Sequence, residues 1–267
     1  MALLTLSNIH KTFEKGTVNE NHVLRGLNLD IEQGDFISVI GGNGAGKSTL
    51  MNSIAGVLEI DEGDIFLEGQ SIRKASVAVR SKYISRVFQD PRMGTATNLS
   101  IEENMAVAYR RGKKRSIFKK SLTEPEREIF KEALMNLGLG LENRLKTDAA
   151  FLSGGQRQAL TLSMATLVRP KVLLLDEHTA ALDPKTSDMV MSLTKKIVEE
   201  HSLTTLMITH NMEHAIEYGN RLVMLYHGKI VVDIRGEEKK NLTVAQLMDL
   251  FHKNSGQNLN DDALVLG

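Results

Sequence analysis

The sequence has no cysteine among its 267 residues, and its charges balance, with 33 lysines and arginines against 33 aspartates and glutamates. The lack of cysteine excludes disulfides and thiolate metal sites within this chain and is typical of a protein from a reducing compartment. A net charge of zero gives no reason to expect nucleic acid as a partner.

Long apolar runs are also missing from the sequence. None approaches the ~18 consecutive apolar residues that a membrane-spanning helix needs. The first residues lack the basic start and the apolar core of a signal peptide. We therefore expect that any work at a membrane goes through another protein.

One glycine-rich stretch matches the pattern of a P-loop, the turn that binds nucleotide phosphates. It consists of Gly41, Gly42, Asn43, Gly44, Ala45, Gly46, Lys47, Ser48 and Thr49. A β-branched apolar stretch precedes it and apolar residues at helical spacing follow it, so the motif has the required order of strand, loop and helix. We expect Lys47 to reach the β- and γ-phosphates and the Ser48 hydroxyl to bind Mg²⁺. The sequence therefore predicts a bound nucleoside triphosphate.

The pattern of apolar residues predicts an α/β chain in which a helical segment interrupts the P-loop core. Short strands broken by turns are expected in residues 2–40, and another at 65–67. Helices are predicted near 101–110, 124–138, 153–167, 186–200 and 211–218, and strands at 172–175, 204–208 and 222–225. We expect one domain over residues 1–253 with a helical subdomain at about 91–165, and a flexible tail over 254–267.

A second motif ends the predicted strand at 172–175 with two carboxylates, Asp176 and Glu177. Downstream of a P-loop this arrangement is typical of a Walker B strand, whose end we expect beside the phosphate-binding loop. Asp176 would hold the hydration shell of Mg²⁺, and Glu177 would act as general base on the water that attacks the γ-phosphate. An acidic pair that only caps a strand is the alternative, and the P-loop upstream argues against it.

The segment Leu152-Ser153-Gly154-Gly155-Gln156 distinguishes between the classes of P-loop protein. Ser153 is expected to cap a helix, and the two glycines would leave its first amides bare, which builds a second anion-binding helix start. Here the sequence resembles the ATP-binding-cassette (ABC) ATPases, whose signature is LSGGQ, over nearly the whole chain. The resemblance implies a P-loop core with an N-terminal antiparallel β subdomain and an inserted α-helical subdomain. It also implies a head-to-tail homodimer, in which the signature of one copy closes the ATP site of the other. A P-loop kinase or GTPase would leave this segment without an explanation.

The resemblance assigns roles to further residues. Gln89 corresponds to the Q-loop glutamine that reaches Mg²⁺ and water, and Asp183 belongs to the D-loop that crosses the dimer interface. His210 corresponds to the switch histidine that contacts the γ-phosphate. Phe13 stands where the family has an aromatic ring that stacks on adenine, although a phenylalanine in an N-terminal strand is often a core residue. His178 departs from the proline that usually follows the Walker B glutamate; it either hydrogen-bonds near the D-loop or leaves the turn to be kept by other means.

A basic run lies within the expected helical insert, with seven positive charges in the eleven residues 110–120. Such a run can face anionic lipid headgroups or the cytoplasmic loops of a permease. A solvated loop explains the same composition equally well.

Two functions are compatible with these motifs. The first is the stand-alone ATPase subunit of an ABC transporter, in which two copies bind ATP and Mg²⁺ and drive a separate membrane permease from the cytoplasmic face of the cell membrane. Such subunits are typical of bacterial importers that use a solute-binding protein. The sequence of Asp176–Pro184 resembles that of a subgroup of these importers, some of which are suspected of carrying amino acids, aromatic ones among them.

The second function is a non-transport ABC ATPase that acts in translation, DNA repair or chromosome structure. Those proteins usually show tandem cassettes, zinc-binding cysteines or long coiled coils. This sequence has one cassette, no cysteine and no sustained heptads, which favours the transporter subunit.

Overall fold

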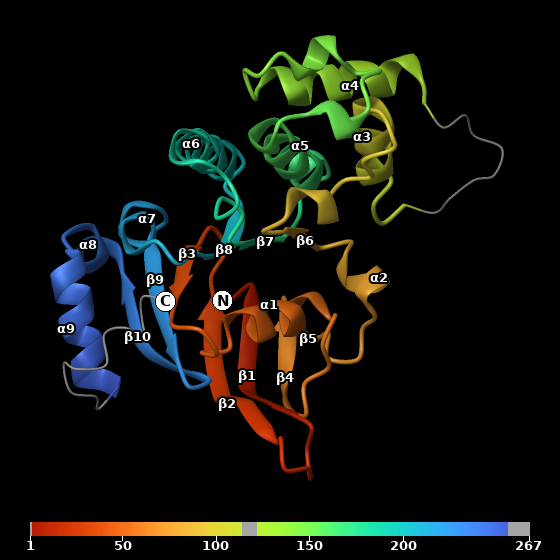
Figure 1. The fold of residues 1–267 in the computed structure, drawn as a ribbon. Coiled ribbons are helices and arrows are strands. Elements are labelled where there is room, and N and C mark those ends of the chain that lie inside the picture. The colour runs from red at the N-terminus through yellow and green to blue at the C-terminus, as the bar shows by residue number, and fades with distance from the viewer. Residues whose placement is uncertain (1, 114–121, 256–267) are drawn as a thin grey trace. The chain divides into compact units, whose positions relative to one another are not determined.

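The computed structural model describes residues 2–113 and 122–255, which form two compact units (Figure 1). The first unit combines Met1–Arg80 with Leu203–Gly267, as far as these stretches are described, and the second comprises Ser81–Ser202. The chain is an α/β protein with an antiparallel sheet in its N-terminal part, which confirms the predicted fold class.

The first unit contains a four-stranded antiparallel sheet. In spatial order its strands are β2 (Asn21–Ile31), β1 (Leu4–Phe13), β4 (Glu62–Leu67) and β5 (Gln70–Ser71). Leu4 pairs with Ile31 and Leu6 with Leu29, and all four side chains are buried. Since alternate residues of a strand point to the same face, these pairs make one side of the sheet apolar. The strands expected in residues 2–40 and at 65–67 are thereby confirmed.

The P-loop strand β3 (Phe36–Ile40) lies between two parallel neighbours in the same unit. These are β8 (Thr204–Ile208) and β9 (Arg221–Tyr226), and β10 (Lys229–Arg235) pairs antiparallel with β9. Every residue of β3 and of β8 is buried, as expected for parallel strands that are covered on both faces. The carboxyl ends of β3 and β8 therefore meet at one edge of the sheet, where the loops after them begin.

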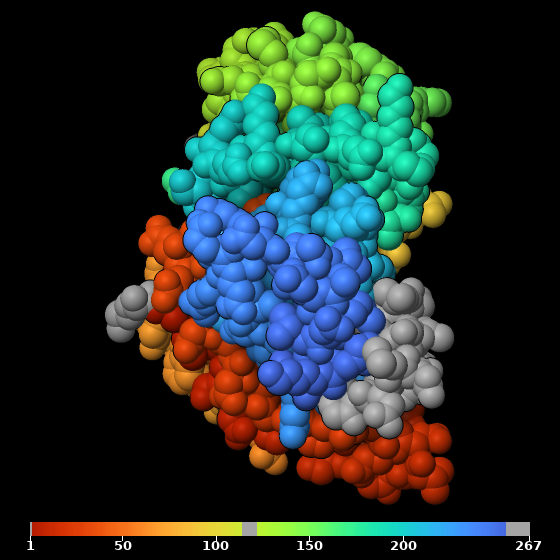
Figure 2. Space-filling view, turned by 90° about the vertical axis from the view of Figure 1, so that its left-hand side faces the viewer, coloured from red at the N-terminus to blue at the C-terminus, as the bar shows by residue number. Residues whose placement is uncertain are grey.

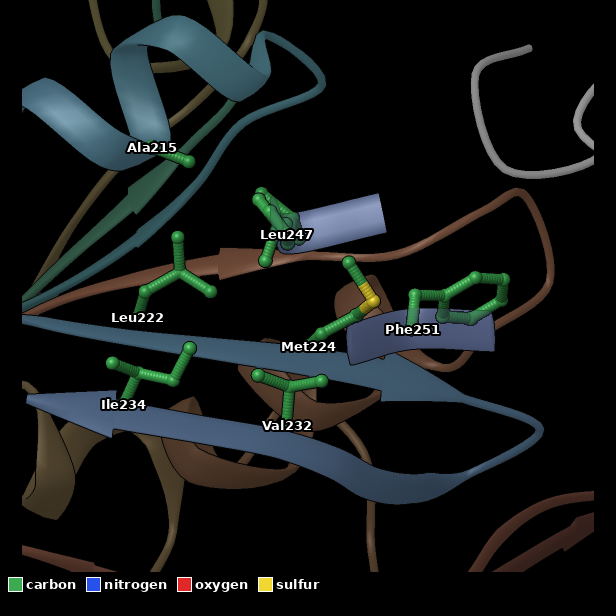
Figure 3. Packing of buried hydrophobic residues seen from close by; sticks show 8 residues of the cluster. Ala215, Leu222, Met224, Val232, Ile234, Leu247 and Phe251 are labelled. Atoms are coloured by element: carbon green, nitrogen blue, oxygen red, sulfur yellow. The ribbon is translucent and has the colours of Figure 1, made fainter. Parts of the chain in front are cut away.

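Helices cover this sheet through an apolar cluster. The helices of the unit are α1 (Lys47–Ala55), α2 (Val77–Arg80), α7 (Met212–Glu217), α8 (Gly236–Lys240) and α9 (Val244–Ser255). Leu247 and Phe251 of α9 pack over β9 and β10 (Figure 3). The outer surfaces of α8 and α9, in blue, face the viewer in Figure 2.

The sequence pattern did not predict β10, α8 or α9. Helix α9 includes the first two residues of the expected tail, and 256–267 lie outside the described residues.

A buried lysine joins α8 to the end of α7. Lys239 is 2% exposed, and its Nζ donates to the carbonyl oxygens of Ile216 (2.6 Å), Tyr218 (2.9 Å) and Gly219 (3.0 Å). These are carbonyls at the C-terminal end of α7, where a cation is favourable. Burial lowers the pKa of Lys239 from its ordinary value of 10.5 to about 8.

We expect the unfolding free energy to rise as the pH goes from about 8 toward 10.5, because the folded state then releases the Lys239 proton before the unfolded state does. The difference between the two pKa values corresponds to about 3 kcal/mol at most. Urea unfolding of the wild type and of Lys239→Met between neutral and alkaline pH measures this increment. The variant lacks the titrating group, so equal slopes in both proteins would contradict the prediction.

The second unit contains the parallel pair β6 (Ile84–Val87) and β7 (Val172–Asp176) and a set of helices. The helices are α3 (Ile101–Tyr109), α4 (Glu124–Met135), α5 (Gly154–Leu167) and α6 (Pro184–Glu200), with the 3₁₀ turns η1 (Pro91–Met93), η2 (Leu141–Asn143) and η3 (Ala149–Phe151). All four helices lie at predicted positions. None of the helices in residues 2–113 and 122–255 is both long and apolar enough to cross a bilayer.

Candidate functional site

The predicted site residues are divided between the two units. Phe13, the P-loop and His210 belong to the first unit. The second unit contains Gln89, the signature segment 152–156, Asp176, Glu177 and Asp183. The local geometry of each group shows what it can do.

The P-loop requires glycine at its first position. Gly41 has a φ of 150°, and a Cβ on it would lie 2.3 Å from the backbone oxygen of Leu225. Gly46, the last residue before α1, has a φ of 102°, a conformation that L-residues rarely adopt. Other residues at these positions would displace the loop.

Helix α1 begins without a side-chain cap among the described residues, whereas α3, α5, α6 and α7 each begin with one. An α-helix leaves its first amide groups without an acceptor inside the helix, and in α1 this turn begins with Lys47 and the exposed Ser48. Those amides and the positive end of the helix dipole favour a bound anion. The start of α1 therefore fits the phosphate groups that the motif predicts.

The loop itself holds the ammonium group of Lys47. Its Nζ donates to the carbonyl oxygens of Gly41 (2.6 Å) and Gly42 (3.2 Å), and the residue is 6% exposed. These bonds fix the lysine side chain along the loop, so a positive charge is already present beside the start of α1. Lys47 thus has both a structural bond to the loop and the charge that a phosphate needs.

His210 lies in the loop after β8, at the same sheet edge as the P-loop. Val39 of β3 pairs with Ile208 of β8, and the amide of Thr209 donates to the Val39 carbonyl at 3.2 Å. His210 is exposed, and the next residue, Asn211, caps α7 through its side chain. Within the first unit, the structure thus brings His210, the predicted switch histidine, and the P-loop to the ends of adjacent strands, where open α/β sheets bind ligands.

Phe13 is the last residue of β1 and is not a core residue. It is 39% exposed, and the Lys11 ammonium lies 5.8 Å from the centre of its ring. An exposed ring at a strand end offers a face on which a base can stack. The core interpretation of Phe13 is therefore wrong, and adenine stacking stays a prediction.

In the second unit, Gln89 and the Walker B carboxylates lie at one edge of the β6–β7 pair. Val87 pairs with Leu175 in parallel register. Gln89 follows β6 by two residues, and Asp176 is the last residue of β7. The two parallel strands thus place the glutamine and the carboxylates at the same end of the strand pair, where both strands have their carboxyl ends.

Asp176 forms an ion pair that sequence analysis missed. Its Oδ2 accepts a hydrogen bond from Nη2 of Arg86, and both side chains are 14% exposed. The Arg86 guanidinium also lies over the ring of Phe88, 4.8 Å from its centre. An arginine inside the short strand β6, between Ser85 and Val87, was the signal that could have revealed a buried acidic partner.

The turn after Asp176 is strained at Glu177. Its φ is 46°, in the left-handed region, which costs a non-glycine residue about 1–3 kcal/mol. The carbonyl oxygen of Glu177 accepts from the amide of Ala180 at 2.9 Å. Next to it, His178 is 2% exposed, and its Nε2 lies 2.9 Å from Oγ1 of Thr194 on α6. His178 is therefore bonded to the middle of α6, at Thr194, rather than to the D-loop segment 181–183 itself.

The signature segment forms the predicted helix start. Ser153 caps α5: its Oγ accepts from the amide of Gln156, and Gln156 Oε1 accepts from the amide of Ser153, both at 3.2 Å. This is a capping box. Gly155 is buried beneath α6, where a Cβ would lie 2.3 Å from Cγ2 of Thr186. The second glycine is therefore needed for the close packing of α6 on α5, in addition to any role of its bare amide.

We expect Gly155→Ala to destabilise the protein by about 1–3 kcal/mol through this overpacking. In the double variant Gly155→Ala with Thr186→Ala, the nearest Thr186 atom left is its Cβ at 3.7 Å, so most of the stability should return. Urea unfolding measures both effects. Gly154→Ala is the matched control, since its Cβ would meet only Leu182 Cδ2 at 3.3 Å. A destabilisation that the second change does not relieve would contradict the packing argument.

Asp183 caps helix α6. Its side chain accepts from the amide of Thr186 at 3.1 Å, and Pro184 occupies the first helical position. Hydrogen bonds from the side chain and the backbone of Thr186 lower the pKa of Asp183. Asp183, which is predicted to belong to a D-loop, thus fixes the start of the helix to which His178 is bonded.

The described part of the basic run binds to helices of its own unit. Arg110 pairs with Glu126 at 3.2 Å, and Arg111 donates to the carbonyl oxygens of Ala165 and Val168 at the end of α5. Burial lowers the pKa of Arg111. Arg110 and Arg111 are therefore structural rather than part of a solvated loop, and residues 114–120 of the run lie outside the described residues.

Comparison with known proteins gives one matching family model, described as "ABC transporter", over residues 24–180. A tyrosine transport ATP-binding protein of Clostridioides difficile is 45% identical over 249 residues, which are 93% of this chain and 98% of the relative. A phosphonates import ATP-binding protein of Oceanobacillus iheyensis is 36% identical over 239 residues, 87% of this chain and 90% of the relative.

Solved structures of ATP-binding cassettes are also similar. The cassette MJ0796, in a dimeric post-hydrolysis state bound to ADP and Pi, matches with a TM-score of 0.74 and 28% identity over 87% of this chain and 98% of that chain. The cassette CbiO1 of Clostridium perfringens, part of the transporter complex CbiONQ, matches with a TM-score of 0.75 and 25% identity over 94% of this chain and 95% of that chain.

Proposed function

Because this chain belongs to the ABC transporter family and is an ATP-binding ATPase subunit, we propose that it drives a separate membrane permease for the import of a small solute. The observation that carries the proposal is the match with the tyrosine transport protein, which covers nearly the full length of both chains. The phosphonates import relative is likewise an import protein by its name. Attachment to the cytoplasmic face of the membrane would come from the permease.

Two copies of the chain are proposed to act together. Each copy has two helix starts that we expect to bind anions: that of α1 at Lys47, which has no side-chain cap, and that of α5 at Gly154, where the Ser153 side chain takes the amide of Gln156. One nucleotide needs only one P-loop, so the signature of each copy is left to close the site of the other. The dimeric state of the related cassette bound to ADP and Pi supports this arrangement.

The residues of this chain divide the work of hydrolysis. Lys47 and the first amides of α1 bind the phosphates, Phe13 stacks on adenine, and His210 contacts the γ-phosphate. Glu177 takes a proton from the attacking water as general base. From the partner copy, the glycines of the signature add amide donors, the Ser153 hydroxyl donates its proton, and Asp183 lies at the interface.

Ser48, Gln89 and Asp176 are proposed to hold Mg²⁺. A hydroxyl, an amide oxygen and a carboxylate are the hard oxygen donors that this ion takes, so the residue types fit. Bound Mg²⁺ neutralises charge on the phosphates. Asp176 is paired with Arg86 in this structure. A bound Mg²⁺ would therefore compete with the Arg86 guanidinium for the Asp176 carboxylate.

The proposed cargo is an aromatic amino acid. The name of the relative from Clostridioides difficile, tyrosine transport, supports this choice. The ATPase itself does not contact the solute, so the cargo is a proposal about the assembled system.

Purification of the chain from its native membranes tests the transporter role. We expect a polytopic membrane protein to copurify, and the complex in liposomes to accumulate tyrosine only when ATP and Mg²⁺ are supplied on the side of the ATPase. Copurification with ribosomes or DNA instead would show the non-transport function. Transport of another solute by the complex would contradict only the choice of cargo.

A further inference from the structure

The buried hydrogen bond of His178 joins its ring to a hydroxyl that is also bonded within α6. The hydroxyl of Thr194 lies 2.9 Å from the carbonyl oxygen of Val190, to which it can donate its one proton. The same hydroxyl lies 2.9 Å from Nε2 of His178, and with its proton on the Val190 carbonyl it accepts from an Nε2–H. Thr194 is fully buried and His178 is 2% exposed, so water does not compete for this bond. The imidazole is therefore joined to α6 inside the protein.

This bond acts on the turn that carries Glu177. On one side of Glu177, Asp176 is the last residue of β7, directly after Leu175, which pairs with Val87 of β6. On its other side is the anchored His178. Glu177 itself has a φ of 46°, which a non-glycine residue keeps only where its neighbours enforce it. Strand β7 and the His178–Thr194 bond are thus two supports on either side of a strained residue.

Helix α6, to which His178 is bonded, is itself held in place at its start. Asp183 caps its start, and its first turn packs directly against Gly155 of α5. Both contacts lie in the same unit as Glu177. A side chain bonded to the middle of α6 is therefore fixed relative to the signature helix as well as to the D-loop.

We propose that His178 is a positioning residue for hydrolysis, which holds the Glu177 carboxylate in place through its hydrogen bond to Thr194. It does not contact the nucleotide. Its effect falls on the rate of the chemical step and leaves ATP binding unchanged, because it acts on Glu177 and on none of the residues that we expect to bind the phosphates. The proposal rests on the proposed function, in which Glu177 is the general base.

The variant Thr194→Val removes the hydroxyl and keeps the shape of the side chain. We expect it to lower kcat by about 10- to 100-fold, the effect of a displacement of catalytic groups by up to 1 Å, with KM for ATP unchanged. Thr194→Ser keeps the hydroxyl and should retain kcat.

His178→Ala should lower kcat by the same factor as Thr194→Val. The double variant should lower it no further than either single change, because both remove the same interaction. In His178→Gln the side-chain amide can take the place of Nε2–H and donate to Thr194. This variant should therefore have a higher kcat than His178→Ala.

The matched control is Thr166→Val. Thr166 makes the same type of bond on α5, from its hydroxyl to the carbonyl of Leu162 at 3.0 Å, and the carbonyl of Ser163, 3.3 Å from that hydroxyl, belongs to the same helix. It should lose stability without losing kcat. In the wild type, the ¹⁵N shifts of His178 should report an Nε2–H tautomer whose proton exchanges slowly, and Thr194→Val should abolish that protection.

The possible outcomes separate the two proposals. Normal turnover by Glu177→Gln overturns the role of Glu177 and, with it, the premise of this inference. An inactive Glu177→Gln variant together with an unchanged kcat in Thr194→Val overturns only the role of His178. A loss of stability in Thr194→Val with unchanged kcat for the folded protein likewise shows that the bond is structural alone.

Discussion

Replacement of Glu177 by glutamine should lower ATP hydrolysis by about 10²- to 10⁴-fold and leave ATP binding unchanged. The amide has nearly the same shape as the carboxylate and cannot take a proton from water. Since bound ATP would then persist, we expect the variant to accumulate as a dimer on size-exclusion chromatography with ATP and to return to monomer when ATP is removed.

The control for this substitution is Glu199→Gln, the same change at an exposed position of α6. It should hydrolyse ATP like the wild type. Undiminished turnover by Glu177→Gln would remove Glu177 from the role of general base. An inactive variant that stays monomeric with ATP would keep that role and contradict the head-to-tail dimer.

Replacement of Lys47 by alanine should weaken ATP binding by about 10- to 150-fold. Removal of one charge-assisted hydrogen bond costs about 1.5–3 kcal/mol, and each 1.4 kcal/mol is a factor of ten in affinity. The carbonyls of Gly41 and Gly42 also lose their donor, which loosens the loop. Titration calorimetry with ATP and with ADP measures the effect. The loss should be smaller for ADP, because that ligand has no γ-phosphate.

Two further variants define the role of Lys47. Lys195→Ala removes an exposed lysine and should bind ATP normally. Lys47→Arg keeps the charge, but the planar guanidinium does not fit the buried path of the lysine along the loop, so it should also bind weakly. Full affinity in Lys47→Ala would show that the start of α1 binds the phosphates without the lysine.

Local sequence patterns were sufficient to predict the parts of the site that consist of consecutive residues. The strand before the P-loop, the loop and α1 follow each other in sequence, so composition and spacing predicted all three. The capping box of Ser153 and Gln156 joins residues three apart, and it too was readable as a helix start.

The elements that were missed carried weaker signals. Strand β10 has Ile230, Val232 and Ile234 at alternate positions, with Val231 among the residues between them, and α9 has Leu247 and Phe251 four residues apart. These are the periods of a strand and a helix. In β10 the apolar Val231 blurs the alternation. In both segments the apolar residues form a buried face together with β9 and α7, which supply the other side of the cluster.

By itself, the sequence determined which chemistry this protein can perform, because the motifs for phosphate, Mg²⁺ and water are runs of adjacent residues. Only the tertiary structure decided how those residues are held. Arg86 meets Asp176 across two paired strands, His178 meets Thr194 on the next helix, and the ammonium of Lys239 meets three carbonyls at the end of α7. Such partners are tens of residues apart or on different elements. Their pairing depends on strand register and helix packing, which no local periodicity encodes.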